Sequence, residues 1–294
     1  MNKVSHYKLA ISMMLDLGFG FTEAELIGWA DESVDKAEAK SIRRIMVQGK
    51  GLMVFPITQE YKAMTISNIF SRSALELLGS RIWIPFHFFT VREDLVVERM
   101  TILELLRIMK VKGLSVRDLI KGDHPDRLYW LVFLGLCLHV QQDTYAHESF
   151  IGLRDDRNSV FPGWHPKSFM PNIGHAELPK PVDDPYARWL RTYHMKTKVN
   201  NKGKWEAWMR EIWQDLSTEA GKVEDTETWK VFQACKTESQ LGKALSRSIK
   251  ERTGKTPRYK WKLAKSMKQN NKYYLFLRAA RTWLALYNRS IIDE

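Results

Sequence analysis

The sequence predicts an all-α protein, a single multi-helix domain that holds a polynuclear metal site between its helices. Three observations indicate this. Apolar residues recur at helical spacing along most of the 294 residues, whereas the strict alternation of a half-buried strand is scarce. Helix caps and breakers separate the apolar stretches. One apolar helix also carries histidines and an aspartate on a single stripe. With 44% hydrophobic residues, the chain can bury one large core or two modest ones.

The N-terminal region predicts two helices. Residues 4–17 are amphipathic and stop at Gly18 and Gly20. The sequence Thr22-Glu23-Ala24-Glu25 has the pattern of a capping box, which predicts a helix from there to about Glu38. Residues 40–57 are irregular, with Gly and Pro punctuation that suits a short hairpin.

The rest of the chain predicts further helices around one long loop. Residues 59–79 and 95–110 have helical periodicity, and Ser115 is placed to cap a short helix. Asp123-His124-Pro125 breaks that helix before an apolar helix that begins near Leu128. Residues 152–185 are rich in Gly, Pro, Asn and Asp and predict a long ordered loop, of a length that is usually functional or disordered. Residues 274–292 predict a last apolar helix.

The segment LGLCLHVQQDTYAHESF places His139, Asp143 and His147 at i, i+4 and i+8. On a helix these positions drift by only about 40° per step, so the three side chains share one stripe. Two imidazoles and a carboxylate in an apolar helix need partners, and a bound metal ion satisfies them well. The ends of the stripe lie about 12 Å apart, so Asp143 is expected to bridge two ions. The rival interpretation is a set of core histidines hydrogen-bonded to an aspartate.

Other candidate ligands lie in short motifs separated by whole helices. His6 lies in the first helix, Asp31 and Asp35 are i, i+4 in GWADESVDK, and His87 and His175 lie in PFHFFT and PNIGHAELPKPVDDP. Carboxylates and imidazoles gathered from several helices are how helical bundles build polynuclear sites. Together they favour a metal site, although each histidine alone is more often structural.

In their order along the chain, these motifs resemble the zinc-dependent phospholipase C and single-strand nuclease superfamily, which is all-helical, and more closely an uncharacterised bacterial branch of it. The resemblance covers roughly residues 4–190. It implies two or three zinc ions, or similar divalent transition metals, that bind a phosphodiester and a hydroxide. It also implies metal ligands at His6, Asp35, His87, His139, Asp143, His147 and His175.

The resemblance further implies that Asp35 or Asp31 acts as ligand and general base. Three features differ from the superfamily, one of which is that its next histidine after the His-x3-Asp pair is usually spaced further on than His147. The secreted members use a mature N-terminal tryptophan as a ligand, whereas this chain begins MNKVSH. Their late His-x3-acid pair is also missing, and Asp183 or Asp184 is the candidate to replace its acid. The number of metal ions therefore stays open.

Composition gives further expectations. The two cysteines form no disulfide framework, so a reducing compartment is allowed. The N-terminus lacks the pattern of a secretory signal, and the longest apolar run is too short to span a bilayer. The sequence therefore predicts a cytoplasmic protein without a transmembrane segment, and its oligomeric state is unknown. A dinucleotide enzyme or nucleotide-driven motor is disfavoured, because no glycine-rich phosphate loop follows a strand.

The C-terminal third is strongly basic. Between Lys243 and Lys272 there are eleven Lys or Arg and one acid, which gives +10, against +12 for the whole chain. Tyrosine and tryptophan interleave with the cations, as suits nucleic acid or an anionic membrane surface. The rival interpretation is a solvated helix face. We therefore divide the chain into a metal-binding core, 1–195, and a basic helical part, 196–294, whose candidate polyanion-binding residues are Arg258, Lys260, Lys262, Lys265 and Lys268.

These features predict a metal-dependent phosphodiester hydrolase that acts on nucleic acid or a nucleotide, with a metal-activated water as nucleophile. Two alternatives stay open. One is a phospholipase C-like lipid hydrolase, and the other is a non-enzymatic helical binding protein stabilised by metal.

Overall fold

A computed structural model gives the arrangement of the chain and describes residues 4–36, 84–151, 158, 184–191, 197–218, 221–259 and 272–292. The all-α prediction is confirmed. The described helices include one π-helix and one 3-10 helix, and their bounds are η1 Val4–Leu9, α1 Ala10–Asp16, α2 Phe21–Lys36, α7 Ile84–His87, α8 Ile102–Ile108, α9 Val116–Lys121, α10 Arg127–Ala146, α12 Asn201–Leu216, η5 Val223–Asp225, α13 Glu227–Ala234, α14 Glu238–Thr253 and α15 Lys272–Ile292. The strands β1 Arg188–Arg191 and β2 Thr197–Asn200 form one antiparallel hairpin, in which Arg188 pairs with Asn200.

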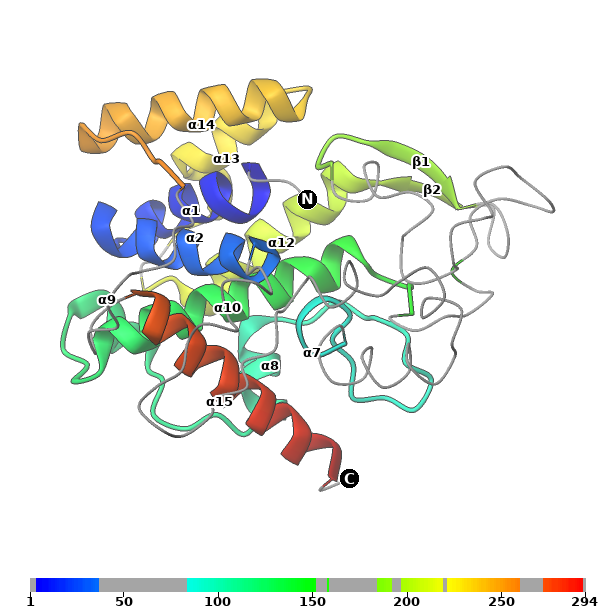
Figure 1. Cartoon of the computed structure of the whole chain (residues 1–294). Helices are drawn as coiled ribbons and strands as arrows, with labels where there is room; N and C mark the ends of the chain where they lie inside the picture. The colour runs from blue at the N-terminus through cyan, green and yellow to red at the C-terminus, as the bar shows by residue number, and fades with distance from the viewer. Residues whose placement is uncertain are drawn as a thin grey trace.

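Helix α10 is the centre of the fold. All its residues from Leu131 to Ala146 are buried, as expected of a helix that is apolar on every side. Figure 1 shows α10 crossing the middle of the molecule, with α2 packed on one side and α15 on the other. Helices α7, α8, α9 and α12 also contact it. The charged and imidazole side chains on α10 are therefore enclosed by helices from both halves of the sequence.

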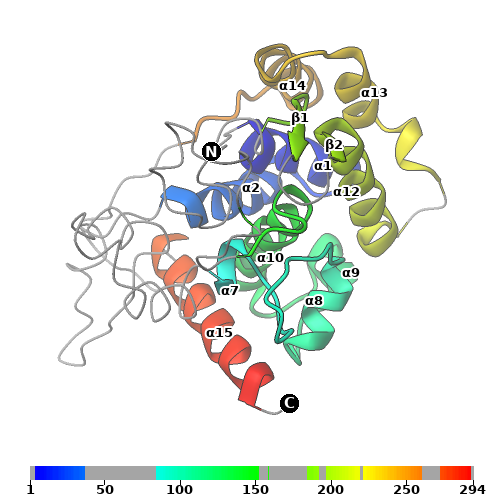
Figure 2. The same cartoon turned by 90° about the vertical axis from the view of Figure 1, so that its right-hand side faces the viewer.

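The N-terminal helices lie between α10 and the C-terminal pair α13–α14. Figure 2 shows α13 and α14 on the far side of η1 and α1 from α10. Polar contacts join these layers: the buried Ser12 Oγ lies 2.7 Å from Thr228 Oγ1, and at the surface Arg252 donates to Asp16 Oδ1 over 2.6 Å. Since α12, α14 and α15 all contact elements of residues 1–195, the basic part packs on the core. The domain boundary at 195 stays a prediction.

Local signals explain most helix ends. Ser115 caps α9 by accepting from the Asp118 amide, as its sequence predicts. Thr101 and Glu104 form a capping box, so α8 begins at Ile102 rather than near residue 95. The predicted capping box at Thr22 is wrong, because α2 already begins at Phe21 and the Ala24 amide bonds to the Gly20 carbonyl.

Some predicted elements lie outside the described residues. These are the possible hairpin in 40–57, the helix in 59–79 and almost all of the long loop 152–185. Within the described part of the chain, no helix is long and apolar enough to cross a membrane.

Candidate metal centre

Helices α2 and α10 approach each other closely enough to bring their acidic and imidazole side chains into contact. At Gly135 of α10, a Cβ atom would lie 2.3 Å from the Ile27 carbonyl oxygen and 2.7 Å from Ala30 Cβ, so only glycine fits. One helical turn further along each helix stand His139 and Asp31. The Gly135 contact thus sets the spacing at which these two side chains meet.

Two short elements bring the other histidines to this line of contact. His6 lies in the π-helical turn η1, a conformation that often marks functional positions. Gly28 of α2 lets this turn approach, because a Cβ there would lie 2.9 Å from the Tyr7 carbonyl oxygen. His87 ends the single turn α7, which is held by α15 through a hydrogen bond from Trp283 Nε1 to the Pro85 carbonyl over 2.8 Å.

Three ligand-type atoms from α7 and α10 form a tight triangle. His87 Nδ1 lies 2.9 Å from Asp143 Oδ2 and 3.2 Å from His139 Nε2, and the remaining edge, His139 Nε2 to Asp143 Oδ2, is 3.3 Å. Neighbouring ligands of a tetrahedral zinc ion with bonds of 2.0–2.1 Å stand about 3.3 Å apart. Asp35 Oδ1 lies 3.9 Å from His87 Nδ1 and 4.0 Å from His139 Nε2 on the open side of the triangle. These four atoms can therefore hold one metal ion with little movement.

Asp31 fixes how two of the imidazole rings are turned. Its Oδ1 atom accepts hydrogen bonds from His6 Nδ1 over 3.1 Å and from His139 Nδ1 over 3.3 Å. With Nδ1 protonated, each ring presents the lone pair of Nε2 on its other side. For His139 that atom is a corner of the triangle, and for His6 it lies 3.7 Å from the second Asp143 oxygen, Oδ1. This is the carboxylate–histidine arrangement that orients metal ligands in other proteins.

The whole cluster is removed from water. Its seven side chains are 0–8% exposed, and they are His6, Asp31, Asp35, His87, His139, Asp143 and His147. Asp31 Oδ2 and Asp35 Oδ2 are buried and have no hydrogen-bond partner among the described residues. Buried carboxylate oxygens without partners are costly. A cation bound beside these carboxylates would offset their buried charge.

The electrostatics of the metal-free cluster follow from three buried carboxylates next to imidazoles. Burial and the His139 charge lower the pKa of His6, but the hydrogen bond and charge of Asp31, with the charge of Asp35, outweigh them and raise it to about 9. Burial likewise opposes charge on His139, and the Asp143 and Asp31 contacts raise its pKa well above the usual value. Burial opposes ionisation of Asp143, while the His147 and His139 charges hold its pKa well below the usual value. A metal ion bound by these imidazoles would therefore have to displace their protons.

Two overlapping sets of side chains have ligand atoms close enough to share an ion. The first is His6, Asp31 and His139, and the second is Asp35, His87 and His139, with all ligand atoms of each set within 4.8 Å of one another. All donors are nitrogen or oxygen, because neither set contains a cysteine. Zn²⁺, Mn²⁺, Fe²⁺ and Co²⁺ accept such ligands, whereas Cu⁺ prefers sulfur.

The structure brings together most of the predicted site residues. His6, Asp31, Asp35, His87, His139 and Asp143 meet in one cluster. His147 touches the cluster through Nδ1, which donates to the His87 carbonyl over 2.6 Å and lies 3.8 Å from Asp143 Oδ2. Like Asp143, it belongs to neither of the two ligand sets. Arg258 is exposed. The remaining predicted residues lie outside the described ones and are His175, Asp183, Lys260, Lys262, Lys265 and Lys268.

Sequence reasoning missed two neighbours of the centre. Glu32 is completely buried and lies between Asp31 and Asp35 in the sequence DESVD, so a third acidic residue in this segment was visible from the sequence. Trp205 of α12 stands with its ring 6.4 Å from the His6 ring, centroid to centroid, and nothing in the local sequence pointed to it.

Comparison with known proteins gives one match. A family model described as "Family of unknown function (DUF6765)" matches residues 1–290. No curated protein and no solved structure matches the chain.

Proposed function

The chain belongs to the DUF6765 family, whose function is unknown, and we propose that its buried cluster binds two divalent transition-metal ions and hydrolyses phosphodiesters. The observation that carries the proposal is the triangle of His87 Nδ1, His139 Nε2 and Asp143 Oδ2, whose edges of 2.9–3.3 Å suit the ligands of a single ion. Its chemistry suits Zn²⁺ or a similar ion, held by nitrogen and oxygen donors alone.

Each residue has a distinct role in this proposal. His87, His139, Asp143 and Asp35 would hold the first ion. His6 and Asp143, whose Nε2 and Oδ1 atoms are 3.7 Å apart, would hold the second, so that Asp143 would be shared by both sites. Asp31 is a positioning residue, because its Oδ1 accepts hydrogen bonds from the Nδ1 atoms of both His6 and His139. Asp35 is the better candidate of the two aspartates for accepting a proton from the attacking water, because Asp31 Oδ1 is already engaged by two imidazoles.

The hydrolase part of the proposal rests on the chemistry that such a centre supplies. When bound, two neighbouring divalent ions neutralise phosphoryl oxygens and lower the pKa of a coordinated water toward neutrality. The resemblance to the phospholipase C and single-strand nuclease superfamily points to the same substrate class. The basic C-terminal part favours nucleic acid or a nucleotide over a lipid, because a row of cations gains affinity for long polyanions by releasing counterions.

Element analysis of protein purified without chelator is the test that separates these hypotheses. We expect about two equivalents of a divalent transition metal per chain and turnover of at least one of single-stranded DNA, RNA, phosphatidylcholine or a cyclic dinucleotide. Metal-loaded protein that turns over none of them would favour the metal-stabilised binding protein. A well-folded, metal-free protein whose thermal unfolding ignores chelators would overturn the whole proposal.

The different roles of Asp31 and Asp35 give a second prediction. Asp31→Asn should keep both metal equivalents but weaken metal binding about 10–100-fold, as is typical when an outer partner of a ligand is lost. Asp35→Asn removes a direct ligand and should cost the first ion at the same free metal concentration. Titration with chelator-buffered metal measures both. Loss of a whole equivalent in Asp31→Asn would instead place Asp31 among the ligands.

A third prediction concerns pH. In metal-free protein the pKa of His6 is about 9, above its unfolded value, so stability from the protonated cluster is complete below about 6.5 and is lost as pH rises through 9. Metal binds neutral imidazole, so its affinity should rise about tenfold per pH unit for each displaced proton over this range. Melting temperatures with buffered metal and with chelator should therefore diverge as pH increases. A metal-induced shift that is constant from pH 6.5 to 9 would contradict this.

A further inference from the structure

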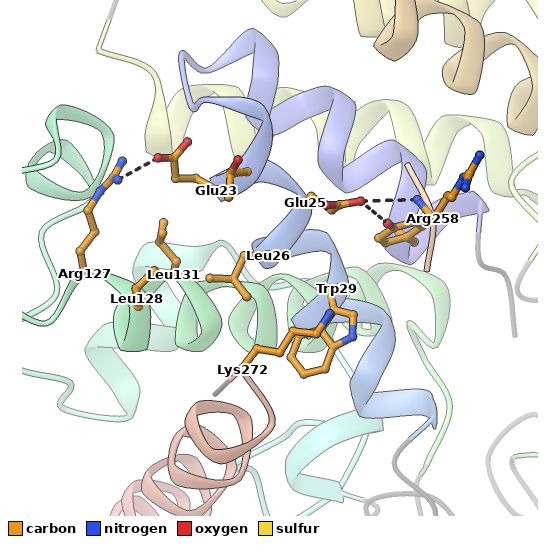
Figure 3. Close-up of a pocket in the computed structure, with 11 residues that line it drawn as sticks. Glu23, Glu25, Leu26, Trp29, Arg127, Leu128, Leu131, Arg258 and Lys272 are labelled. Atoms are coloured by element: carbon orange, nitrogen blue, oxygen red, sulfur yellow. Dashed lines mark hydrogen bonds and ion pairs between the residues drawn. The ribbon is translucent and has the colours of Figure 1, made fainter. Parts of the chain in front are cut away.

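A second cavity lies along the outer face of α2, away from the metal centre. It has a volume of about 260 Å³ and is bordered by α2, the start of α10, Arg258 and the start of α15 (Figure 3). Its α2 residues include Glu25, Leu26 and Trp29, at i, i+1 and i+4. Asp31 and Asp35 point in a direction about 150° further around the helix axis. We call this cavity the outer pocket, and a molecule bound in it would not contact the metal ligands.

The floor of the outer pocket is apolar. Figure 3 shows Leu26 of α2 facing Leu128 and Leu131 of α10, with the Trp29 indole at the far end. Leu131 is buried in the core, whereas Leu128 is 48% exposed and is one of only two exposed large hydrophobic side chains among the described residues. A ligand with an apolar body would cover this leucine and gain the corresponding transfer free energy.

The two carboxylates of the outer pocket already have partners. Arg127 Nη1 donates to Glu23 Oε1 over 2.9 Å, and Arg127 Nε donates to the Leu119 carbonyl over 2.9 Å, so this arginine is held in place. The Glu25 Oε1 atom accepts from the Tyr7 hydroxyl over 3.1 Å and from the Arg258 backbone amide over 3.4 Å. The acidic side chains are thus engaged within the protein.

Two cations of the outer pocket make no ion pair with any of the described carboxylates. In the described part of the chain, neither the Lys272 ammonium nor the Arg258 guanidinium has a carboxylate within 4.0 Å. The Lys272 ammonium lies 4.5 Å from the centroid of the Trp29 ring, which holds it over the pocket. Partial burial lowers the pKa of Lys272, and the Glu25 charge opposes this shift only in part. Three cations against two carboxylates leave the pocket with a net charge of +1.

We propose that the outer pocket binds a small organic monoanion with a compact apolar body. Its charged group, a carboxylate, sulfonate or phosphodiester, pairs with Lys272 and Arg258. Its apolar body lies against Leu26, Leu128 and Leu131. This site is independent of the metal centre and of the hydrolase proposal, so either can fail without the other.

Three naphthalene probes of equal size test the charge preference. Equilibrium dialysis of the full chain against 2-naphthalenesulfonate, 2-naphthalenemethanol and 2-naphthylmethylammonium, with and without chelator, measures affinity and stoichiometry. We expect one site, at which the anion binds about tenfold more tightly than the alcohol, as for one charge-assisted contact. The ammonium should bind most weakly, and the chelator should change nothing. Absence of saturable anion binding, or equal or tighter binding of the ammonium, would overturn the proposal.

Variants test whether the probe binds in the outer pocket. Lys272→Gln should reduce anion affinity about tenfold, to the level of the alcohol. Leu128→Asp should weaken binding of the anion and strengthen binding of the ammonium. The helix tolerates this change because an acid near the first turn of α10 interacts favourably with the helix dipole. Lys250→Gln removes an exposed cation of α14 outside the pocket and should have no effect. If Lys250→Gln reduces the affinity for the anion as much as Lys272→Gln does, the probe binds by general surface charge and the proposal is wrong.

Discussion

Asp143→Asn is expected to abolish high-affinity metal binding and phosphodiester hydrolysis while the helical fold is kept. Asp143 is the residue that reaches every imidazole of the cluster: its oxygens lie 2.9 Å from His87 Nδ1, 3.3 Å from His139 Nε2 and 3.7 Å from His6 Nε2. Asparagine has the same shape but no charge, and its amide group offers one oxygen where two are needed to bridge. The loss should exceed the about 100-fold that removal of an outer-shell partner costs.

Metal content, turnover and far-UV circular dichroism measure this effect together. Asp123→Asn is the matched control, because that aspartate is exposed and lies just before α10. It should leave metal content and turnover unchanged. If Asp143→Asn retains both metal equivalents and full activity, Asp143 is not the bridge and the two-metal proposal fails. Loss of helical signal in the variant would instead show that Asp143 is needed for folding, and metal titration of Asp35→Asn would then test the first metal site.

Gly135→Ala is expected to have the second largest effect, through the distance between α2 and α10. The added Cβ would lie 2.3 Å from the Ile27 carbonyl oxygen and 2.7 Å from Ala30 Cβ, and backbone atoms cannot move aside without moving the helix. Overpacking of this kind costs about 1–3 kcal/mol of stability. The shift also separates Asp31 from His139, which stand one turn further along the two helices, so metal affinity should fall as well.

Chemical denaturation with and without chelator separates the two parts of this effect. The packing cost remains in chelator, whereas the loss of metal affinity appears only when metal is present. Gly203→Ala is the control, since among the described residues a Cβ at this helical position meets only Asn200 Nδ2 at 3.9 Å, an ordinary contact. Alanine there should be neutral or stabilising by up to about 1 kcal/mol. Equal destabilisation by both variants would show that the contact at Gly135 is not special.

Local sequence determined the helices and the kinds of side chain at the centre. The apolar run before His139 predicts a buried helix, and α10 is buried throughout from Leu131. The 3.6-residue period places His139 and Asp143 on the same face, where they meet at 3.3 Å. Ser115 caps its helix because a hydroxyl at the N-cap can accept a hydrogen bond from the amide three residues further on, here that of Asp118. These features depend on neighbours along the chain, so the sequence alone predicts them.

Only the tertiary structure determined which contacts each of these side chains makes. Asp31 and Asp35 are equivalent in the sequence pattern, yet Asp31 accepts from two imidazole Nδ1 atoms while Asp35 faces the triangle of His87, His139 and Asp143. That difference depends on the relative rotation and spacing of α2, α7 and α10, which close contacts such as that at Gly135 fix. The outer pocket likewise joins Trp29 to Lys272 across the fold. Contacts between distant elements depend on three-dimensional packing, which no local period or cap encodes.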